Sequence, residues 1–239
     1  MIEKYKQYVE QFNQSDSRIV YKWEHSLRVM EKMQALSKVL KQNQQDYELA
    51  TIIGLFHDYG RFYQVENFNT YQDQVFDHGD YGAEQLIHKH ELQNFISEKV
   101  DEQVIYDAIK NHNKFQIDSK IKDRSLLFSK MVRDADKLDI LEGIAKGYVT
   151  LEEDDSDITP EVKDIFFQNR ELLSSLRKTK NDRIVSFLCL IYDLNYQWSY
   201  QYLDNHNILN QIFERLVHKE MFKPYFEELH NFINKEKEE

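Results

Sequence analysis

The adjacent pair His57-Asp58 lies at the end of the most apolar segment that the sequence predicts to be helical. Residues 47–58 are apolar nearly all round, as expected of a helix buried in a core. An imidazole and a carboxylate are costly to bury unless they are paired with other groups or bound to a metal ion. A capping or surface role is the alternative, but the position of the pair favours a site with further polar partners.

Suitable partners occur on other predicted elements, before and after this helix. They are His25, His78, His112, Asp134 and Asp136. Imidazoles and carboxylates are side chains that bind divalent transition metals. The sequence therefore allows one polar site to which several elements contribute.

The order His, His-Asp, His, His, Asp resembles the HD superfamily of metal-dependent phosphohydrolases. The resemblance covers about residues 20–140 and depends on five segments, which are His25-Ser-Leu-Arg-Val29, Leu55-Phe-His-Asp-Tyr-Gly-Arg61, His78-Gly-Asp-Tyr-Gly-Ala-Glu84, Asn111-His112 and Ala135-Asp-Lys-Leu138. It implies an all-α fold, a helical bundle of the HD-domain type with additional carboxyl-terminal helices. It also implies an enzyme that cleaves phosphate esters or nucleotide phosphoanhydrides.

The resemblance also implies a ligand set. A first metal ion would be held by His25, His57, Asp58 and Asp136. His78 and His112 match the additional ligands of two-metal members. Asp134 is the alternative to Asp136, because residues two apart on a helix point about 200° apart and only one can face the site. Asp136 matches the Ala-Asp-Lys-Leu segment, so Asp134 would be a cap or an outer partner.

Four imidazoles and two carboxylates define the chemistry of such a site. Two carboxylates offset only half the charge of two divalent cations, which leaves positive charge for a hydroxide and a substrate phosphate. Imidazole-rich ligation favours Mn, Fe, Co, Ni or Zn over Mg. One or two such ions would be the cofactors. With two ions roughly 3.5 to 4 Å apart and Asp58 as the protein bridge, a water between them would be deprotonated near neutral pH and would attack phosphorus in line.

Four basic residues near these segments are candidates for binding phosphoryl oxygens. Arg61 follows the His-Asp pair and Lys137 follows the last ligand, so both are candidate catalytic residues beside Asp58. Arg28 and Lys114 are further candidates for substrate binding. A solubilising role at the surface is the alternative for each.

The substrate class is less well defined than the site. Five nearby aromatic residues could form a wall for a nucleobase or sugar, or could pack a covering segment: Tyr59, Phe62, Tyr63, Phe68 and Tyr71. The sequence does not select among nucleotides, dinucleoside polyphosphates, alarmones and cyclic dinucleotides. We therefore expect a small phosphorylated substrate, with nucleotides as the first candidates.

The composition favours helices around a substantial core. The 239 residues are 41% hydrophobic and include only 6 glycines and 2 prolines, too few for the turns of a sheet-rich fold. We predict helices at residues 18–41, 47–58, 80–90, 98–111, 124–141, 160–176, 183–205 and 208–235, and an ordered loop at 62–77. The acidic stretch 152–157 predicts a boundary between a catalytic core, residues 1–150, and a carboxyl-terminal extension, residues 151–239, packed on it.

Charge, cysteine content and hydropathy limit the partners and the cellular compartment that we expect. The net charge of −11 opposes binding to duplex nucleic acid or to an anionic membrane. Cys189 is the single cysteine and lies in an apolar run, which indicates a buried, inert thiol. No apolar signal region or membrane-spanning stretch is present, so we expect a cytoplasmic protein; the oligomeric state stays open.

Other enzyme classes lack their motifs here. The chain has no glycine-rich phosphate loop, dinucleotide fingerprint, serine elbow or His-Glu-x-x-His helix, which argues against kinases, dehydrogenases, serine hydrolases and zincins. Two alternatives remain beside the hydrolase: a di-iron oxygenase on the same scaffold and a helical binding module without catalysis. Activity with iron but not Mn would indicate the first, and stability unaffected by chelation would indicate the second.

Overall fold

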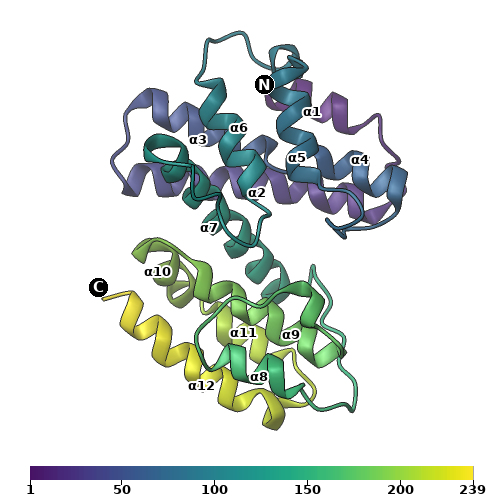
Figure 1. Ribbon diagram of the computed structural model, residues 1–239, viewed down its shortest axis with the longest axis vertical. Helices are drawn as coiled ribbons and strands as arrows, with labels where there is room; N and C mark the ends of the chain where they lie inside the picture. Colours follow the sequence, from purple (N-terminus) through teal and green to yellow (C-terminus); the bar gives the residue numbers. More distant parts are fainter. Residues whose placement is uncertain (239) are drawn as a thin grey trace. The chain divides into compact units, whose positions relative to one another are not determined.

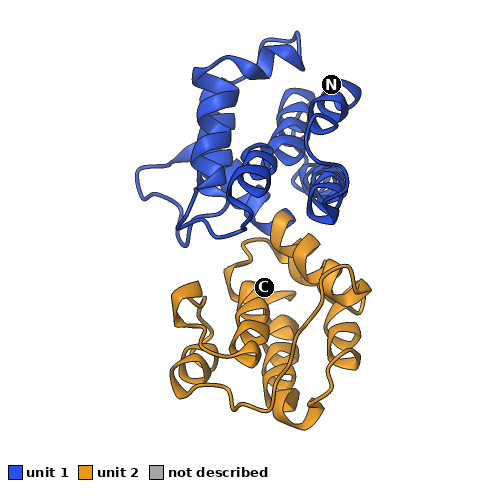
Figure 2. Cartoon of the chain, turned by 90° about the vertical axis from the view of Figure 1, so that its right-hand side faces the viewer, with its two compact units in different colours: residues 1–135 blue, residues 136–239 orange. Residues whose placement is uncertain are grey.

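The computed structural model describes residues 1–238, and its regular secondary structure within that range is entirely helical, which confirms the predicted all-α class. The chain divides into two compact units, Met1–Ala135 and Asp136–Glu239 (Figure 2). The division falls within the long helix α7 (Asp123–Lys146), upstream of the acidic stretch 152–157. Helix α7 contributes Phe128 and Val132 to the interior of unit 1 and Leu138 to the core of unit 2, so neither unit ends at a loop.

Unit 1 contains the segments that carry the predicted ligands. Its helices are α1 (Ile2–Val9), α2 (Ser17–Val39), α3 (Gln44–Phe56), α4 (Tyr59–Phe68), α5 (His78–Ala83), α6 (Glu102–Asn111) and the first half of α7 (Figure 1). A π-helical turn (Glu84–His88) continues α5, and a 3-10 turn (Glu91–Asn94) follows. Helix α2 packs along α3, and α5 packs against both α4 and α6. None of the helices in residues 1–238 combines the length and apolar character that a membrane span requires.

Helix α3 is the central buried helix that the sequence predicts. The Asn43 side chain accepts a hydrogen bond from the backbone N–H of Asp46 and caps the first turn. The helix ends at Phe56, so His57 and Asp58 follow it directly. Gly54 permits close packing, because a Cβ there would lie 2.7 Å from the Cα of Met30 on α2.

Two glycines bring α5 against the start of α4. A Cβ on Gly60 would lie 2.3 Å from the carbonyl oxygen of His78, and one on Gly82 would lie 3.1 Å from the nitrogen of Gly60. Gly60 therefore has no room for a side chain, and a Cβ at Gly82 would be in tight contact with the Gly60 backbone. The backbone of His78 can therefore lie beside the turn that carries His57 and Asp58.

We expect Gly60→Ala to lower the free energy of unfolding by about 1–3 kcal/mol, because the added methyl group must displace the His78 backbone. Denaturant unfolding followed by circular dichroism measures the change. Gly79→Ala is the comparison and should lose less stability, since the closest atoms to its methyl group belong to the Asn113 side chain and the nearest backbone atom, Ile109 O, is 3.2 Å away. Equal stability of the two variants would show that the Gly60 contact does not constrain the fold.

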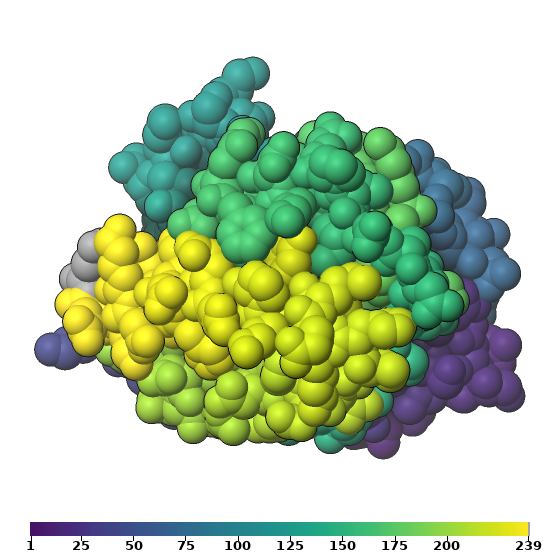
Figure 3. Space-filling view, turned by 90° about the horizontal axis from the view of Figure 1, so that it is seen from below, coloured from purple at the N-terminus to yellow at the C-terminus, as the bar shows by residue number. Residues whose placement is uncertain are grey.

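Unit 2 has its own apolar core. Its further helices are α8 (Pro160–Phe166), α9 (Lys180–Leu188), α10 (Gln197–Asn205), α11 (Ile208–Glu214) and α12 (Lys219–Glu236). Helix α12 buries Phe222, Phe226 and Leu229, and its opposite side forms the yellow surface in Figure 3. Cys189 is buried, and burial raises the pKa of its thiol to about 12, as expected of an inert thiol.

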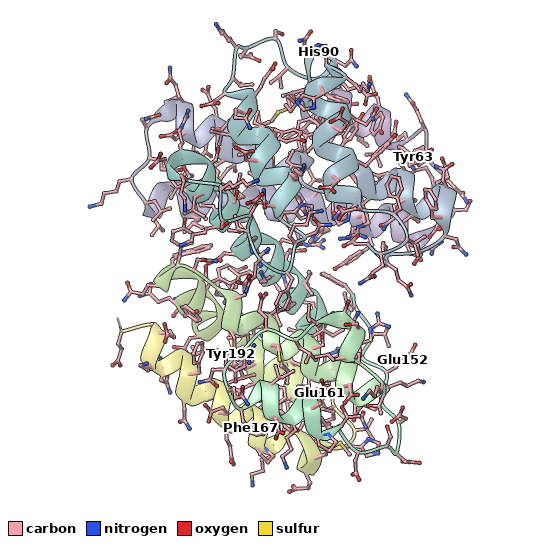
Figure 4. The ribbon with its side chains drawn as sticks, in the orientation of Figure 1. Tyr63, His90, Glu152, Glu161, Phe167 and Tyr192 are labelled. Atoms are coloured by element: carbon pink, nitrogen blue, oxygen red, sulfur yellow. The ribbon has the colours of Figure 1, made fainter. Side chains whose placement is uncertain are left out.

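Aromatic rings pack where α8 ends. The ring of Phe166 contacts those of Phe167 and Tyr192, both labelled in Figure 4, with centroids 5.2 and 5.3 Å away. Edge-to-face pairs at such distances add to the stabilisation from burial. Helix α8 begins at Pro160, as predicted, but it ends at Phe166, where these rings pack, rather than near residue 176.

The structure differs from the prediction at further elements. Helix α1 was not expected, although Tyr5 and Val9 are four apart and both buried. Residues 62–68, expected to belong to a loop, continue α4, whose buried Phe62 and Val65 share one face. The predicted helices 183–205 and 208–235 are each interrupted. At the first break Leu194 is extended and its carbonyl accepts a hydrogen bond from the Tyr200 hydroxyl.

Candidate metal centre

The predicted ligands come from five places along unit 1 and the adjoining part of α7. His25 lies on α2, His57 and Asp58 join α3 to α4, His78 begins α5, His112 follows α6, and Asp136 lies on α7. The first five side chains are buried, and Asp136 is partly buried. Buried ionisable groups in this number need mutual hydrogen bonds or a cation.

Their potential ligand atoms form three overlapping groups. Within each group the atoms all lie within 4.8 Å of one another; the groups are His25, His57 and Asp58, then Asp58, His78 and His112, then His57, His112 and Asp136. Asp136 follows Ala135 on one continuous helix, so its position depends on the part of α7 that belongs to unit 1. Among the described residues, Asp136 and not Asp134 belongs to such a group.

Asp58 lies between two pairs of histidines. Its Oδ2 is 3.5 Å from Nε2 of both His25 and His57. Its Oδ1 is 3.0 Å from Nε2 of His78 and 3.8 Å from Nε2 of His112. Each carboxylate oxygen therefore faces one histidine pair, an arrangement that suits a carboxylate shared by two cations.

Hydrogen bonds at Nδ1 orient three of the four rings. The acceptors are Gly54 O for His57 at 2.8 Å, Ile109 O for His112 at 2.6 Å, and Asp73 Oδ1 for His78 at 2.7 Å. Carbonyls and carboxylates only accept, so each Nδ1 carries a proton. In the neutral rings each Nε2 is then an acceptor that points into the site.

The inward nitrogens approach one another closely. The Nε2 atoms of His25 and His57 are 3.2 Å apart, and those of His78 and His112 are 2.9 Å apart. Burial lowers the pKa of His112 to about 4, which keeps this ring neutral near pH 7. Both His78 and His112 carry their proton on Nδ1, so their two Nε2 atoms are acceptors and cannot hydrogen-bond each other. A cation placed between them would satisfy both, so the donor set fits the imidazole-rich transition-metal site that the sequence predicts.

Two protein cations point at the same acceptors. The Nζ of Lys22 is 2.6 Å from Asp58 Oδ2, and Nη2 of Arg61 is 3.0 Å from His78 Nε2. Burial by itself raises the pKa of Asp58, but the Lys22 ammonium holds it well below its usual range, so this carboxyl is ionised. Arg61 is among the residues predicted from the sequence, and Lys22 is not. The missed signal is spacing, since Lys22 precedes His25 by three residues on α2 and shares its face.

The other predicted cations are engaged with carboxylates. Lys137, Arg28 and Lys114 form ion pairs with Asp193, Glu24 and Asp77 in that order. Lys137 is buried and has a second carboxylate, that of Glu171, at 3.8 Å. A substrate-binding role for these three residues stays a prediction.

Arg133 on α7 stabilises the turn that follows His112. Its buried guanidinium donates hydrogen bonds to the carbonyl oxygens of Asn111 at 3.2 Å, of Phe115 at 3.3 Å and of Lys114. This fixes the backbone on either side of the His112 ring. This role of Arg133 cannot be recognised in the sequence, because every residue has a backbone carbonyl that could accept such a hydrogen bond.

The aromatic residues near the centre have different roles. Tyr59 and Phe62 are buried, and both pack against Tyr5, so they do not form a wall for a ligand. Tyr71 is 41% exposed, and its ring centroid is 5.9 Å from Lys22 Nζ and 5.4 Å from Arg61 Cζ. Only Tyr71 of these three places an exposed ring beside the two cations at the centre.

The remaining histidines lie outside the cluster. His88 and His90 are exposed, and Figure 4 shows His90 in the turn after the π-helical segment, at the outer edge of unit 1. His206, His218 and His230 belong to unit 2. None of these five joins the groups of possible ligands among the described residues.

Comparison with known proteins agrees with this geometry. The family model of the HD domain matches residues 23–141, a segment that includes all six predicted ligands. No curated protein and no solved structure matches the chain.

Proposed function

The chain belongs to the HD superfamily, and from this we propose that it is a metal-dependent phosphohydrolase that cleaves phosphate esters or nucleotide phosphoanhydrides. The observation that carries the proposal is the position of Asp58 between two pairs of converging Nε2 atoms. One divalent ion would be held by His25, His57, Asp58 and Asp136, and a second by Asp58, His78 and His112. The nitrogen-rich donor set favours Mn, Fe, Co, Ni or Zn over Mg.

The protein groups around this centre suit a phosphoryl substrate. When bound, divalent metals supply a water of lowered pKa and polarise a phosphoryl oxygen. The ring orientations fixed at Nδ1 keep the ligand nitrogens in place without rearrangement during turnover. Lys22 and Arg61 supply positive charge at the same place, in a chain whose net charge is −11, and they can stabilise the charge that develops on phosphoryl oxygens.

Lys22→Met is expected to reduce kcat/KM by about 10²-fold while the metal content stays unchanged, because the side chain contacts the substrate and is no metal ligand. Steady-state kinetics and elemental analysis of the same sample measure both quantities. Lys38→Met is the matched control, an exposed lysine further along α2. An unchanged kcat/KM would reduce Lys22 to a counter-ion of Asp58.

Tyr71 supports nucleotides as the substrate class. Its exposed ring lies beside Lys22 and Arg61, so a base or sugar could pack on the ring while a phosphate meets the two cations. Neither Tyr59 nor Phe62 can contribute such a surface. The proposed substrate is therefore a small phosphorylated molecule with a planar group.

The test is a hydrolysis screen of chelated protein reloaded with Mn, Fe, Co, Ni, Zn or Mg in separate samples. Substrates would include nucleoside mono-, di- and triphosphates, dinucleoside polyphosphates, cyclic dinucleotides and simple phosphate esters. Phosphate release and product chromatography identify the bond that is cleaved. We expect activity with at least one transition metal and less with Mg. Turnover that requires iron and oxygen, or no cleavage with any metal, would contradict the proposal.

A further inference from the structure

Asp73 contacts the metal centre from outside the ligand set. It lies in the segment of residues 69–77 between α4 and α5, and its Oδ1 accepts a hydrogen bond from Nδ1 of His78 at 2.7 Å. The carboxylate is partly buried, with 30% of the side chain exposed. The guanidinium of Arg61 also binds this carboxylate, with Nη1 3.3 Å from the same oxygen.

The place of His78 in the fold explains why a side chain is needed here. His57 and His112 each donate Nδ1–H to the carbonyl three residues earlier, Gly54 or Ile109, which belongs to the helix that precedes the ring. His78 is the first residue of α5, so it has no preceding turn of helix to supply that carbonyl. Asp73 provides the acceptor instead.

The segment that carries Asp73 is held in place independently of His78. Gln64, buried on α4, donates Nε2–H to Phe76 O at 2.6 Å and to Gln72 O at 3.3 Å. Arg61 Nη1 donates to Tyr71 O at 3.1 Å. These bonds fix the backbone on both sides of Asp73.

Aromatic packing fixes the two ends of the same segment. Phe68, the last residue of α4, stacks on Phe76 near the end of the segment, with ring centroids 4.7 Å apart. Tyr63, labelled in Figure 4, stacks on Tyr81 of α5 at 4.8 Å. The segment therefore presents the Asp73 carboxylate in one position.

We infer that Asp73 is a positioning residue, which fixes the Nδ1–H tautomer of His78 and strengthens the metal-binding half formed by Asp58, His78 and His112. The inference rests on the metal centre of the proposed function but not on the identity of its substrate. A carboxylate acceptor on Nδ1–H increases the basicity of Nε2 and orients the ring. Asp73 acts through His78, which belongs to only one of the two halves. We therefore expect metal affinity to change in that half and not in the half formed by His25 and His57.

The test compares Asp73→Asn with Asp77→Asn in metal-free, substrate-free protein. An amide can present either its oxygen or its NH₂ to Nδ1, so asparagine at 73 removes the preference for one tautomer. Asp77 is the matched control: it lies in the same segment and loses the same charge. Its Oδ1 accepts from the N–H of Asp80 and from Asn113 Nδ2, bonds that an asparagine oxygen also accepts, and its ion-pair partner Lys114 keeps Asp80 at 2.9 Å. Titration with Co²⁺, followed by calorimetry and visible absorption, gives the affinity of each half.

Wild type and Asp77→Asn should bind two Co²⁺ ions, whereas in Asp73→Asn one of the two binding events should lose about 10- to 100-fold in affinity while the other is unchanged. Nitrogen-15 spectra of the histidine rings should show Nδ1–H at His78 in wild type and a tautomer mixture in Asp73→Asn. Equal affinities in all three proteins, equal loss at both halves, or a single event in wild type would overturn the inference. Two events with the expected loss but no hydrolysis would leave it standing and contradict only the proposed function.

Discussion

Asp58→Asn is expected to reduce turnover at least about 10³-fold, because it removes the carboxylate that presents one oxygen to each histidine pair. The amide has nearly the same shape, so the packing of α3 against α2 should persist. It cannot offset the charge of two divalent ions, and it leaves the Lys22 ammonium without its partner. Loss of metal affinity should therefore accompany loss of activity.

The measurement is phosphate release by wild type and variant after identical chelation and reloading, with circular dichroism to compare helix content. Asp155→Asn is the matched control, since it removes one negative charge from an exposed side chain in unit 2. Activity of Asp58→Asn close to that of the control would remove Asp58 from the site. It would also show that any phosphatase activity comes from elsewhere in the preparation.

His78→Ala and His112→Ala form the second prediction with a large effect. Their Nε2 atoms are 2.9 Å apart on the Oδ1 side of Asp58, so either change leaves the second ion with too few ligands. Fully loaded wild type should contain close to two transition-metal ions per chain, falling to about one in either variant, with activity reduced at least about 10²-fold.

Elemental analysis of desalted protein gives the metal count, and the same samples provide the rates. His88→Ala is the control, because His88 is exposed and pairs with Glu84. If wild type holds one ion and the double variant hydrolyses substrate normally, catalysis requires only the ion held by His25, His57, Asp58 and Asp136. A general base on the protein would then have to activate water.

Part of the cluster of possible ligands can be recognised in the sequence, where residue type and helix position coincide. His57 and Asp58 are recognisable because an apolar helix ends at them, and the order of the other histidines follows the family pattern. Lys22 was missed although its three-residue spacing to His25 was readable. Asp73 was missed for a physical reason: its partner is set by the path of the segment between α4 and α5, and spacing along the sequence does not encode that path.

Helices were predicted where the local sequence pattern determines them and were missed where contacts with distant residues determine them. Helix α3 was predicted because burial on all sides produces a continuous apolar run. Helix α4 was missed because Arg61 and Gln64 are polar yet buried, bound to the following segment, and so hide the apolar face of Tyr59, Phe62 and Val65. The break at Leu194 depends on the distant Tyr200 hydroxyl and on the core of unit 2, neither of which helical periodicity reports.

The most direct test of the account is the rate of phosphate release from a substrate found in the screen, measured as Mn²⁺ is titrated into chelated wild-type protein. The account predicts no release without metal, a rate that rises with bound Mn²⁺, and a plateau near two ions per chain. A rate that is independent of Mn²⁺, or equal in wild type and Asp58→Asn at every addition, would contradict hydrolysis at the centre formed by His25, His57, Asp58, His78, His112 and Asp136.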